Sequence, residues 1–403
     1  MLAERVRPGL EVLLARRLEL LRRRRVGLIT NPTGVTPELE GAAEVLLRRG
    51  VKVTALFAPE HGLQASAPDG TAVASGRDRC TGLPVYSLYG ETLQPTAQML
   101  REVDVLLFDI QDVGARFYTY VWTMSYAMET AAAAGLPFIV LDRPNPLGGQ
   151  IVEGPLLEAA WASFVGRAAI PLRHGLTVGE LARFFNEHPG TTAVQASDGF
   201  LHTPIGAELI VVPMEGWRRE MWYDGTGLPW VPPSPAMPTL DAATLYPGTC
   251  LLEGTNLSEG RGTALPFQQV GAPWVDGYVL ADALNALNLP GVRFRPVRFQ
   301  PTAGKWAGQE CEGVHLHVTD RRALHPVTVG LQLIAAVRAL HPDRFAWRPP
   351  EAEEGRWHFD LLVGSNKVRR QLEAGVSVET IAAGWEAECA NFGAQRERVF
   401  LYW

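Results

Sequence analysis

Short runs of apolar residues alternate with longer stretches of helical periodicity over the first two-thirds of the chain. The short runs lack polar alternation, which is typical of parallel strands that are buried on both faces. Residues 38–49 and 121–134 are examples of the helical stretches. Strands are predicted at residues 25–30, 53–59, 104–110, 137–142, 208–214 and 249–254. This alternation of strands and helices predicts an α/β fold with an open, mostly parallel sheet.

The pattern changes beyond about residue 270. Residues 292–301 and 313–320 alternate like half-exposed strands, and residues 327–340 have helical periodicity. A chain of 403 residues also favours two domains. We therefore expect an α/β domain at residues 1–268 and a smaller C-terminal α+β domain at residues 269–403.

Residues 227–240, GLPWVPPSPAMPTL, are too rich in proline to form a helix or a central strand. The same stretch suits a rigid structural strap across the surface and the wall of a cleft. Its composition leaves both interpretations open.

Polar side chains gather at the predicted carboxyl ends of the strands. In open α/β sheets, ligands bind in the crevice outside these ends. A turn needs polar residues, but it does not need acids at nearly every strand end, so the positions predict a ligand site. The residues concerned include Asn31, Glu60, His61, Asp109, Gln111, Asp112, Asp142, Arg143, Glu253 and Asn256.

Glu60 is the strongest catalytic candidate. It follows a buried strand in LFAPEHGL, behind Pro59, where desolvation disfavours its charged form. A carboxyl group that keeps its proton near neutral pH is what a general acid requires. The alternative is that Glu60 caps a turn. The adjacent His61 could orient Glu60, contact a substrate or bond a backbone carbonyl.

The stretch FDIQDVGARFYTYVWTM, residues 108–124, mixes acids, an amide and aromatic rings. This mixture suits a sugar, whose faces are apolar and whose rim carries hydroxyl groups. For Tyr118 and Trp122, four residues apart on a helix, a place in the core is the favoured interpretation. Arg116 and Arg143 either pair with nearby aspartates or clamp a carboxylate in a bidentate fashion. The glycine-rich segment at residues 253–263 has the composition of a recognition loop.

Composition excludes several functional classes. The net charge of -6 argues against nucleic-acid binding, and no apolar stretch approaches the roughly 20 residues of a membrane span. The 4 cysteines are scattered without a CxxC pair, which indicates neither a zinc site nor a disulfide framework. No GxGxxG fingerprint, HExxH or GxSxG motif occurs, so we expect no cofactor. A metal site built from Glu60, Asp109 and Asp112 remains an alternative. No signal peptide is evident, so we expect a cytoplasmic protein.

Several long motifs occur in one order along the chain: GLITNPTGV, LFAPEHGL, DVLLFDIQDVGARFYTYVWTM, VLDRPNPLGG, GLPWVPPSPAMPT and YPGTCLLEGTNLSEGRGT. Together they resemble the exo-β-N-acetylmuramidases, the NamZ or YbbC-like glycosidases. The resemblance extends from about Val26 to the C-terminal VFLYW. It implies a Rossmann-like catalytic domain, a smaller auxiliary domain and an active cleft between them. It also implies release of N-acetylmuramic acid from the non-reducing end of peptidoglycan fragments, and it places the catalytic glutamate of the PEHG motif on Glu60.

The chain departs from the family pattern at a few positions. Gln64 and Ala65 stand where Arg-Gly is expected, Ala236 where Asn is expected, and Gln268 where Glu is expected. These departures concern the fine substrate preference more than the reaction class. Known members of the family are often exported, whereas no leader is evident here.

The working hypothesis is therefore an exo-acting muramidase. A second group must stabilise an oxocarbenium-like state or activate water, with Asp109, Asp112, Glu253 and Glu259 as candidates. Substrate-assisted catalysis through the acetamido group is also open, and Arg143 or Arg261 could clamp the lactyl carboxylate. The alternatives are a non-catalytic muropeptide-binding protein and a metal-dependent hydrolase. The predicted catalytic residues are Glu60, Asp109 and His61, and the predicted substrate-binding residues are Asn31, Gln111, Asp112, Arg116, Tyr118, Asp142, Arg143, Glu253, Asn256, Glu259 and Arg261.

Overall fold

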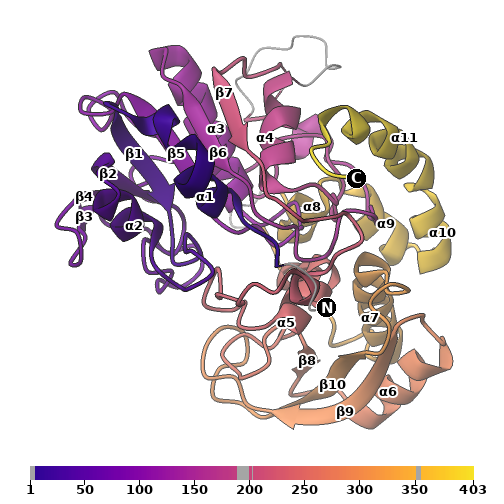
Figure 1. The fold of residues 1–403 in the computed structure, drawn as a ribbon. Coiled ribbons are helices and arrows are strands. Elements are labelled where there is room, and N and C mark those ends of the chain that lie inside the picture. Colours follow the sequence, from indigo (N-terminus) through magenta and orange to yellow (C-terminus); the bar gives the residue numbers. More distant parts are fainter. Residues whose placement is uncertain (1–4, 188–198, 202, 351–354) are drawn as a thin grey trace.

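A computed structural model describes residues 5–187, 199–201, 203–350 and 355–403 (Figure 1). Its larger sheet has seven strands in the order β3-β4-β2-β1-β5-β6-β7. All neighbouring strands pair in parallel except β3, which is antiparallel to β4. The strands are β1 (Arg25–Thr30), β2 (Lys52–Ala58), β3 (Gly76–Arg77), β4 (Pro84–Ser87), β5 (Val105–Asp109), β6 (Phe138–Leu141) and β7 (Leu209–Val212). The predicted open α/β sheet is confirmed.

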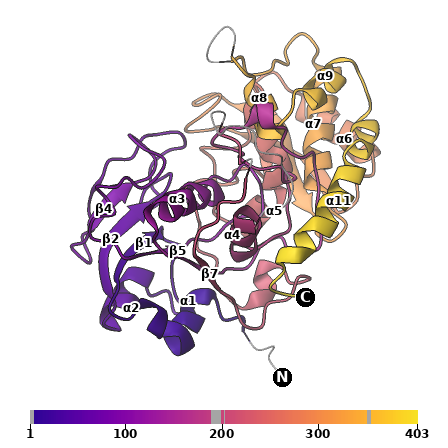
Figure 2. The same ribbon diagram turned by 90° about the horizontal axis from the view of Figure 1, so that it is seen from above.

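Helices cover both faces of this sheet (Figure 2). Leu28 of β1 faces one core with α1 (Gly9–Val12) and α2 (Ala42–Arg48). The next residue, Ile29, faces the opposite core with α3 (Tyr120–Ala134) and α4 (Val178–Glu187). Because side chains alternate across a strand, a strand covered on both sides is apolar at every position, as the sequence indicated.

Helix α4 begins with a capping box, a Thr-x-x-Glu pattern at residues 177–180. The Thr177 hydroxyl accepts a hydrogen bond from the Glu180 N–H, and a Glu180 carboxylate oxygen accepts one from the Thr177 N–H. Each side chain thereby satisfies a backbone donor that the first helical turn leaves unpaired.

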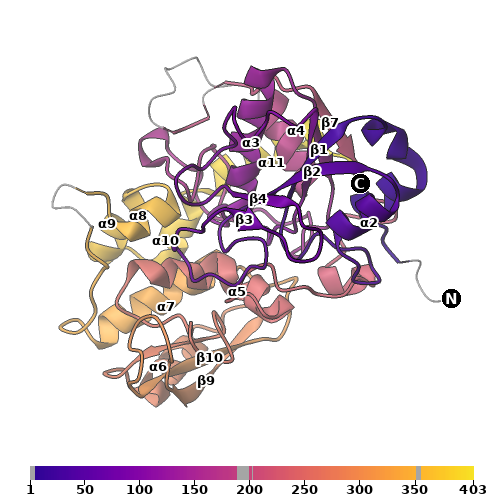
Figure 3. The ribbon, with the colours of Figure 1, turned by 90° about the vertical axis from the view of Figure 1, so that its left-hand side faces the viewer.

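A second, antiparallel sheet forms the lower part of the molecule in Figure 1, and Figure 3 shows it from the side. Its strand order is β8-β10-β9. The strands are β8 (Gln269–Ala272), β9 (Val292–Phe299) and β10 (Cys311–Val318), with helices α6 (Gly277–Ala286) and α7 (Pro326–Leu340). This is the predicted C-terminal α+β domain.

One strand prediction is wrong. Residues 249–254 complete helix α5 (Leu240–Thr249) and continue it as a 3₁₀ turn, Cys250–Gly254. The apolar run is buried because α5 packs closely on α7: a Cβ at Gly248 would lie only 1.7 Å from the Pro326 carbonyl oxygen. A short buried run has no periodicity that separates such a turn from a strand.

The C-terminal helices return to the first domain, and Figure 2 shows α11 close to α4. They are α8 (His358–Val363), α9 (Lys367–Glu373), α10 (Val378–Ala383) and α11 (Glu386–Arg396). Arg396 donates to the carbonyls of His174 and Gly175, both at 3.0 Å. Near the chain end, the Tyr402 hydroxyl donates to Asp142 at 2.6 Å. Residues 355–403 therefore join the two domains.

Short irregular turns complete the fold: a π-helical turn at Leu13–Arg17 and 3₁₀ turns at Leu18–Leu21, Ala159–Trp161, Tyr223–Thr226 and Glu397–Val399. Among the described helices, none is both long and apolar enough to cross a bilayer.

Candidate active site

A cavity of about 470 Å³ lies between the two domains, next to the ends of β2 and β5. Glu60 and Thr119 line it from the first domain, and Arg261, Arg348 and His358 line it from the later part of the chain. Its volume is in the range of small-molecule sites. We call it the catalytic cavity.

Glu60 follows β2 directly and is held in a defined position. The Gly62 N–H donates to the Pro59 carbonyl at 3.0 Å, which closes a turn around Glu60. One oxygen of Glu60 accepts from the Gly70 N–H at 3.0 Å, and the other accepts from the Thr119 hydroxyl at 2.7 Å. Only 8% of the residue is exposed. A carboxyl group so fixed meets the geometric requirement for proton transfer to one bound group.

His61 organises the loop after Glu60. Its backbone has a left-handed φ of 67°, a conformation that is uncommon outside glycine. Nδ1 lies 2.8 Å from the Ala67 carbonyl oxygen, and Nε2 lies 3.6 Å from a carboxylate oxygen of Asp69. Of the roles considered from sequence, the carbonyl contact is present, and His61 also lines the cavity.

Asp69 is a site residue that the sequence reading did not identify. It lines the cavity and forms an ion pair with Arg261. Burial raises the pKa of Asp69; Arg261 and His61 act against this, whereas the negative charges of Glu253 and Glu60 add to it. The only local signal was an Asp-Gly pair inside a polar loop, which normally indicates a turn.

Arg261 gathers several acids at the far wall of the cavity. It contacts Glu253 at 2.8 Å and Glu259 at 3.5 Å in addition to Asp69. Burial opposes ionisation of Glu253, but Arg261, with help from His358, lowers the pKa of Glu253. Arg261 and Glu253 therefore meet the cavity as a charged pair.

Aromatic rings form much of the remaining wall. The Tyr118 and Tyr120 rings meet edge to face at 4.9 Å, and the Tyr246 and Phe267 rings do so at 4.7 Å. Burial, with the nearby Glu60 carboxylate, raises the pKa of Tyr89 to about 12, so its hydroxyl stays neutral. Apolar ring faces beside carboxyl and hydroxyl groups suit the two kinds of surface that a sugar presents.

The proline-rich segment at residues 227–240 is a wall of this cavity. Ser234 and Met237 line it. The Pro233 carbonyl accepts from Asn31 Nδ2 at 3.2 Å and from the Tyr120 hydroxyl at 2.6 Å, which fixes the segment to the end of β1. Asn31, predicted to bind substrate, is thus hydrogen-bonded to the proline-rich segment that forms this wall.

Two family models match the chain. The N-terminal model of exo-beta-N-acetylmuramidase NamZ matches residues 26–241, and the C-terminal model of the same family matches residues 244–402. The chain belongs to the NamZ family. The models divide the chain earlier than residue 268, so the domain boundary proposed from sequence stays a prediction.

A curated relative, peptidoglycan beta-N-acetylmuramidase NamZ of Bacillus subtilis (strain 168), is 46% identical over 399 residues, which are 99% of this chain and 92% of the relative. Two crystal structures of DUF1343 family proteins from Bacteroides fragilis NCTC 9343 are similar to the whole chain. They have TM-scores of 0.88 and 0.75 at 38% and 31% identity, and each match covers 99% of both chains.

In this NamZ-family chain, the acids at the ends of β5 and β6 do not reach the catalytic cavity. Asp109 is fully buried and takes two hydrogen bonds from Arg143, at 2.6 and 2.9 Å. The structure therefore places Asp109, predicted as catalytic, and Arg143, predicted as a carboxylate clamp, outside the residues that line the catalytic cavity. The pair stays internal because residues 223–231 cover this edge of the sheet.

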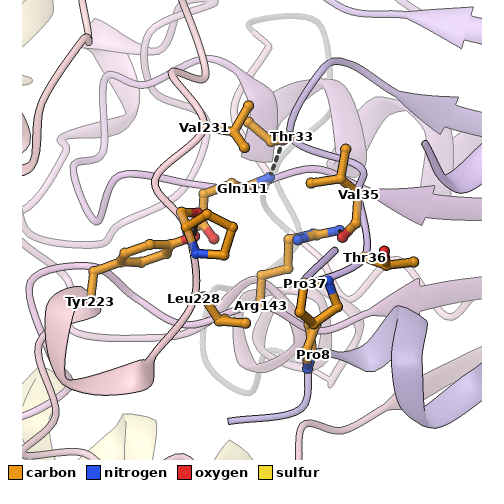
Figure 4. A pocket seen from close by; sticks show the side chains of 11 residues that line it. Pro8, Thr33, Val35, Thr36, Pro37, Gln111, Arg143, Tyr223, Leu228 and Val231 are labelled. Atoms are coloured by element: carbon orange, nitrogen blue, oxygen red, sulfur yellow. Dashed lines mark hydrogen bonds between the residues drawn. The ribbon is translucent and has the colours of Figure 1, made fainter. Parts of the chain in front are cut away.

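Figure 4 shows the small hollow that remains there, with Gln111 and Arg143 among its lining residues. Its volume is about 10 Å³, which is room for about one water molecule and far too little for a sugar. The Gln111 N–H donates to the Thr33 hydroxyl, and its side-chain amide donates to the carbonyls of Asp112 and Pro144. Gln111 therefore holds the loop after β5 and does not line the catalytic cavity.

Asp112 and Asp142 also have internal roles. Asp112 accepts from the Gly114 N–H at 2.7 Å and lies 3.4 Å from His174 Nε2. Asp142 accepts from Thr177, Gly179 and Tyr402. Burial raises the pKa of Asp142 to about 7, against these hydrogen bonds. Neither of these predicted substrate ligands is among the residues that line the catalytic cavity.

Arg116 joins the two domains. It is fully buried and donates to the carbonyls of Pro155, Ile170, Leu362 and Val363. Burial lowers the pKa of Arg116 to about 9. From the sequence we expected Arg116 to pair with an aspartate or to bind a substrate carboxylate. In the structure its hydrogen-bond acceptors are backbone carbonyls.

Two residues of the 253–263 loop also have structural roles. Asn256 donates to the Arg344 carbonyl at 2.8 Å and accepts from the Ala346 N–H at 3.0 Å, which fixes the segment that leads to Arg348. Glu259 is buried 2.8 Å from Lys305 Nζ. Of the predicted substrate-binding residues, the cavity is lined by Tyr118, Glu253 and Arg261, together with the predicted catalytic residues Glu60 and His61.

Within the described ranges, no group of three or more His, Cys, Asp or Glu side chains is arranged to hold a metal ion. The structure therefore offers no preformed place for the metal site considered from Glu60, Asp109 and Asp112.

Proposed function

We propose that this protein is an exo-acting glycosidase that hydrolyses terminal, non-reducing, β-linked N-acetylmuramic acid from peptidoglycan fragments. The relative from Bacillus subtilis is named a peptidoglycan beta-N-acetylmuramidase, and 99% of this chain aligns with it. The observation that carries the proposal is the fixed Glu60 carboxyl group in a cavity of about 470 Å³ between the domains.

Glu60 acts as the general acid. It transfers a proton to the glycosidic oxygen while the bond from that oxygen to the anomeric carbon breaks. Water adds its oxygen to the anomeric carbon, and the proton that water loses restores the carboxyl group.

The second carboxyl group is Asp69. Asp69 and Glu253 both line the cavity with Glu60 and both pair with Arg261, but Glu253 also lies near His358 and its side chain is only 21% exposed. Asp69 is half-exposed and shares its charge environment with Glu60. It stabilises the oxocarbenium-like state, polarises the substrate's acetamido group or activates water. We do not assign this role to Asp109, Asp112 or Glu259, because none of the three lines the cavity.

Arg261 is the cation that we assign to the lactyl carboxylate of muramic acid. It lines the cavity, where it also pairs with Asp69 and Glu253, whereas Arg143 does not line the cavity and pairs with the buried Asp109. Carboxylates are bound well by the planar guanidinium group, which offers several parallel donors. Release of free muramic acid derivatives would place the protein in cell-wall turnover and recycling.

The test is incubation with the β-linked disaccharide of N-acetylmuramic acid and N-acetylglucosamine, followed by identification of the products. We expect both free sugars in equal amounts. Binding without release would identify a muropeptide-binding protein instead. Activity that disappears in chelator and returns with a divalent ion would identify a metal-dependent hydrolase.

A further inference from the structure

A second hollow of about 910 Å³ adjoins the catalytic cavity. It shares Asp69 and Arg261 with that cavity, so the ion pair between these residues stands where the two spaces meet. We call the second hollow the outer groove. Its walls come from residues 66–69, 235–236, 261–266 and 299–304.

The two spaces differ in charge. The catalytic cavity is lined by several acids and cations, including Glu60, Glu253 and Arg348. Among the described residues that line the outer groove, the charged ones are Asp69 and Arg261, which form an ion pair. The other lining groups are hydroxyls, an amide and apolar surfaces such as Thr302, Gln300 and Phe299. This lining suits an uncharged polar ring.

Hydrogen bonds within the chain fix one wall of the outer groove. Thr302 donates to the Gly262 carbonyl from its N–H at 2.9 Å and from its hydroxyl at 2.8 Å. Gly262 has a φ of 76°, and a Cβ there would lie 2.4 Å from the Ala303 nitrogen, so only glycine permits this close contact. A preformed wall reduces the entropic cost of binding.

We propose that the outer groove binds the uncharged N-acetylhexosamine that follows the terminal sugar, the part of the substrate that leaves on hydrolysis. This assignment rests on the proposed function. The glycosidic bond to be broken then lies next to the Asp69–Arg261 pair, where the two spaces meet. Asp69 precedes Gly70 in the chain, and the Gly70 N–H donates a hydrogen bond to Glu60. The leaving oxygen thus lies beside the acid that protonates it.

The experiment fills the outer groove with a bulky side chain. Ala264→Trp and Ala303→Trp place indole rings on two separate wall segments, and both alanines are exposed, so folding is not at risk. Ala286→Trp, at an exposed position at the end of α6, is the matched control. The substrates are the muramyl disaccharide and methyl β-N-acetylmuramide, whose methyl group is too small to occupy the groove.

We expect the ratio of kcat/KM for the disaccharide to kcat/KM for the methyl glycoside to fall about tenfold or more in both groove variants, because a blocked subsite loses its share of transition-state binding. The control should keep the ratio of the unsubstituted protein. An unchanged ratio in both groove variants overturns the assignment. Failure of the unsubstituted protein to cleave either substrate overturns the proposed function instead. In that case, saturation-transfer NMR with N-acetylglucosamine decides: a signal that Ala264→Trp removes supports the groove, and any other result overturns it.

Discussion

The hydroxyl group of Thr119 donates a hydrogen bond of 2.7 Å to Glu60. Thr119 is the residue before the first turn of α3, the helix that follows β5, and Glu60 follows the end of β2. Strands β2 and β5 lie on opposite sides of β1 in the sheet. The position of the Glu60 carboxyl group therefore depends on how β5 and α3 pack relative to β2.

Replacing Thr119 with Val should lower kcat by about 10–100-fold while the KM for substrate changes little, because Glu60 loses an orienting donor and a small misplacement of a reacting group is costly. Thr119→Ser keeps the hydroxyl group and should restore most of the activity. Steady-state kinetics on the muramyl disaccharide measure both variants. Near-normal kcat in Thr119→Val, which keeps the methyl group and lacks the hydroxyl, would show that this hydrogen bond does not orient Glu60.

Glu60→Gln keeps the shape of the side chain but cannot transfer a proton. We expect kcat to fall by about 10²–10⁴-fold, the usual contribution of general acid–base catalysis. Isothermal titration with the disaccharide should still detect binding. Activity near that of the unsubstituted protein would remove Glu60 from the mechanism.

Asp69→Asn tests the second carboxyl group. The pKa of Asp69 is raised, so its ionised form, and the activity that needs it, should disappear on acidification at a higher pH than for an ordinary aspartate. The acidic limb of the kcat/KM profile should therefore be absent from Asp69→Asn, whose overall rate should fall by about 10–10³-fold. An unchanged acidic limb in the variant would assign that titration to another group.

Glu253 should make stability depend on pH. Its folded-state pKa is lowered from 4.5, so its contribution to stability is present above pH 4.5 and is lost as the pH falls through the lowered value. Glu253→Gln should lower the free energy of unfolding by about 1–3 kcal/mol at neutral pH, because a buried charge of Arg261 loses a partner. The variant should also lose less stability on acidification.

The control for this prediction is Glu40→Gln. Glu40 pairs with Arg48 at 2.7 Å, but the two side chains are 48% and 58% exposed, so their pair should contribute little. Denaturant unfolding at neutral and acidic pH measures both variants. The same pH dependence in Glu253→Gln as in the unsubstituted protein would contradict the argument.

Arg116→Met should destabilise the protein by about 3–5 kcal/mol, because four backbone carbonyls, three of them in buried hydrogen bonds, lose their donor. Arg116→Lys should recover part of this loss, since an ammonium group has fewer donors with a shorter reach. Arg101→Met, at an exposed position, is the control and should change little. Thermal unfolding measures all three variants.

Local sequence patterns predicted much of the fold for physical reasons that act over a few residues. The runs at β1, β2, β5 and β6 are apolar throughout because helices cover both faces of the sheet. The Thr177–Glu180 capping box was readable because both partners lie within one turn. The strand prediction for residues 249–254 was wrong because these residues are buried by packing against α7. An apolar run in the sequence does not show which distant element buries it.

The candidate site was predicted in part. Position after a buried strand was sufficient to select Glu60, since the chain must emerge there at the ligand-binding edge of the sheet. The same rule also selected Asp109, which is buried against Arg143. Strand-end position predicts the edge of the sheet at which a side chain lies, but it does not predict which residue that side chain contacts. Asp69 was missed because its place depends on the loop that His61 holds.

The sequence by itself therefore determined the parallel sheet, the second domain and the carboxyl group at the end of β2, because periodicity and strand-end position are local properties. Only the tertiary structure decided which polar groups face the cavity. Asp109 meets Arg143 across 34 residues and Arg116 meets Leu362 across 246 residues, and no local pattern encodes such pairings. A buried charged side chain needs a partner, and the packing of distant segments determines which partner is close enough. The polar groups that face the cavity are the ones that can contact a substrate.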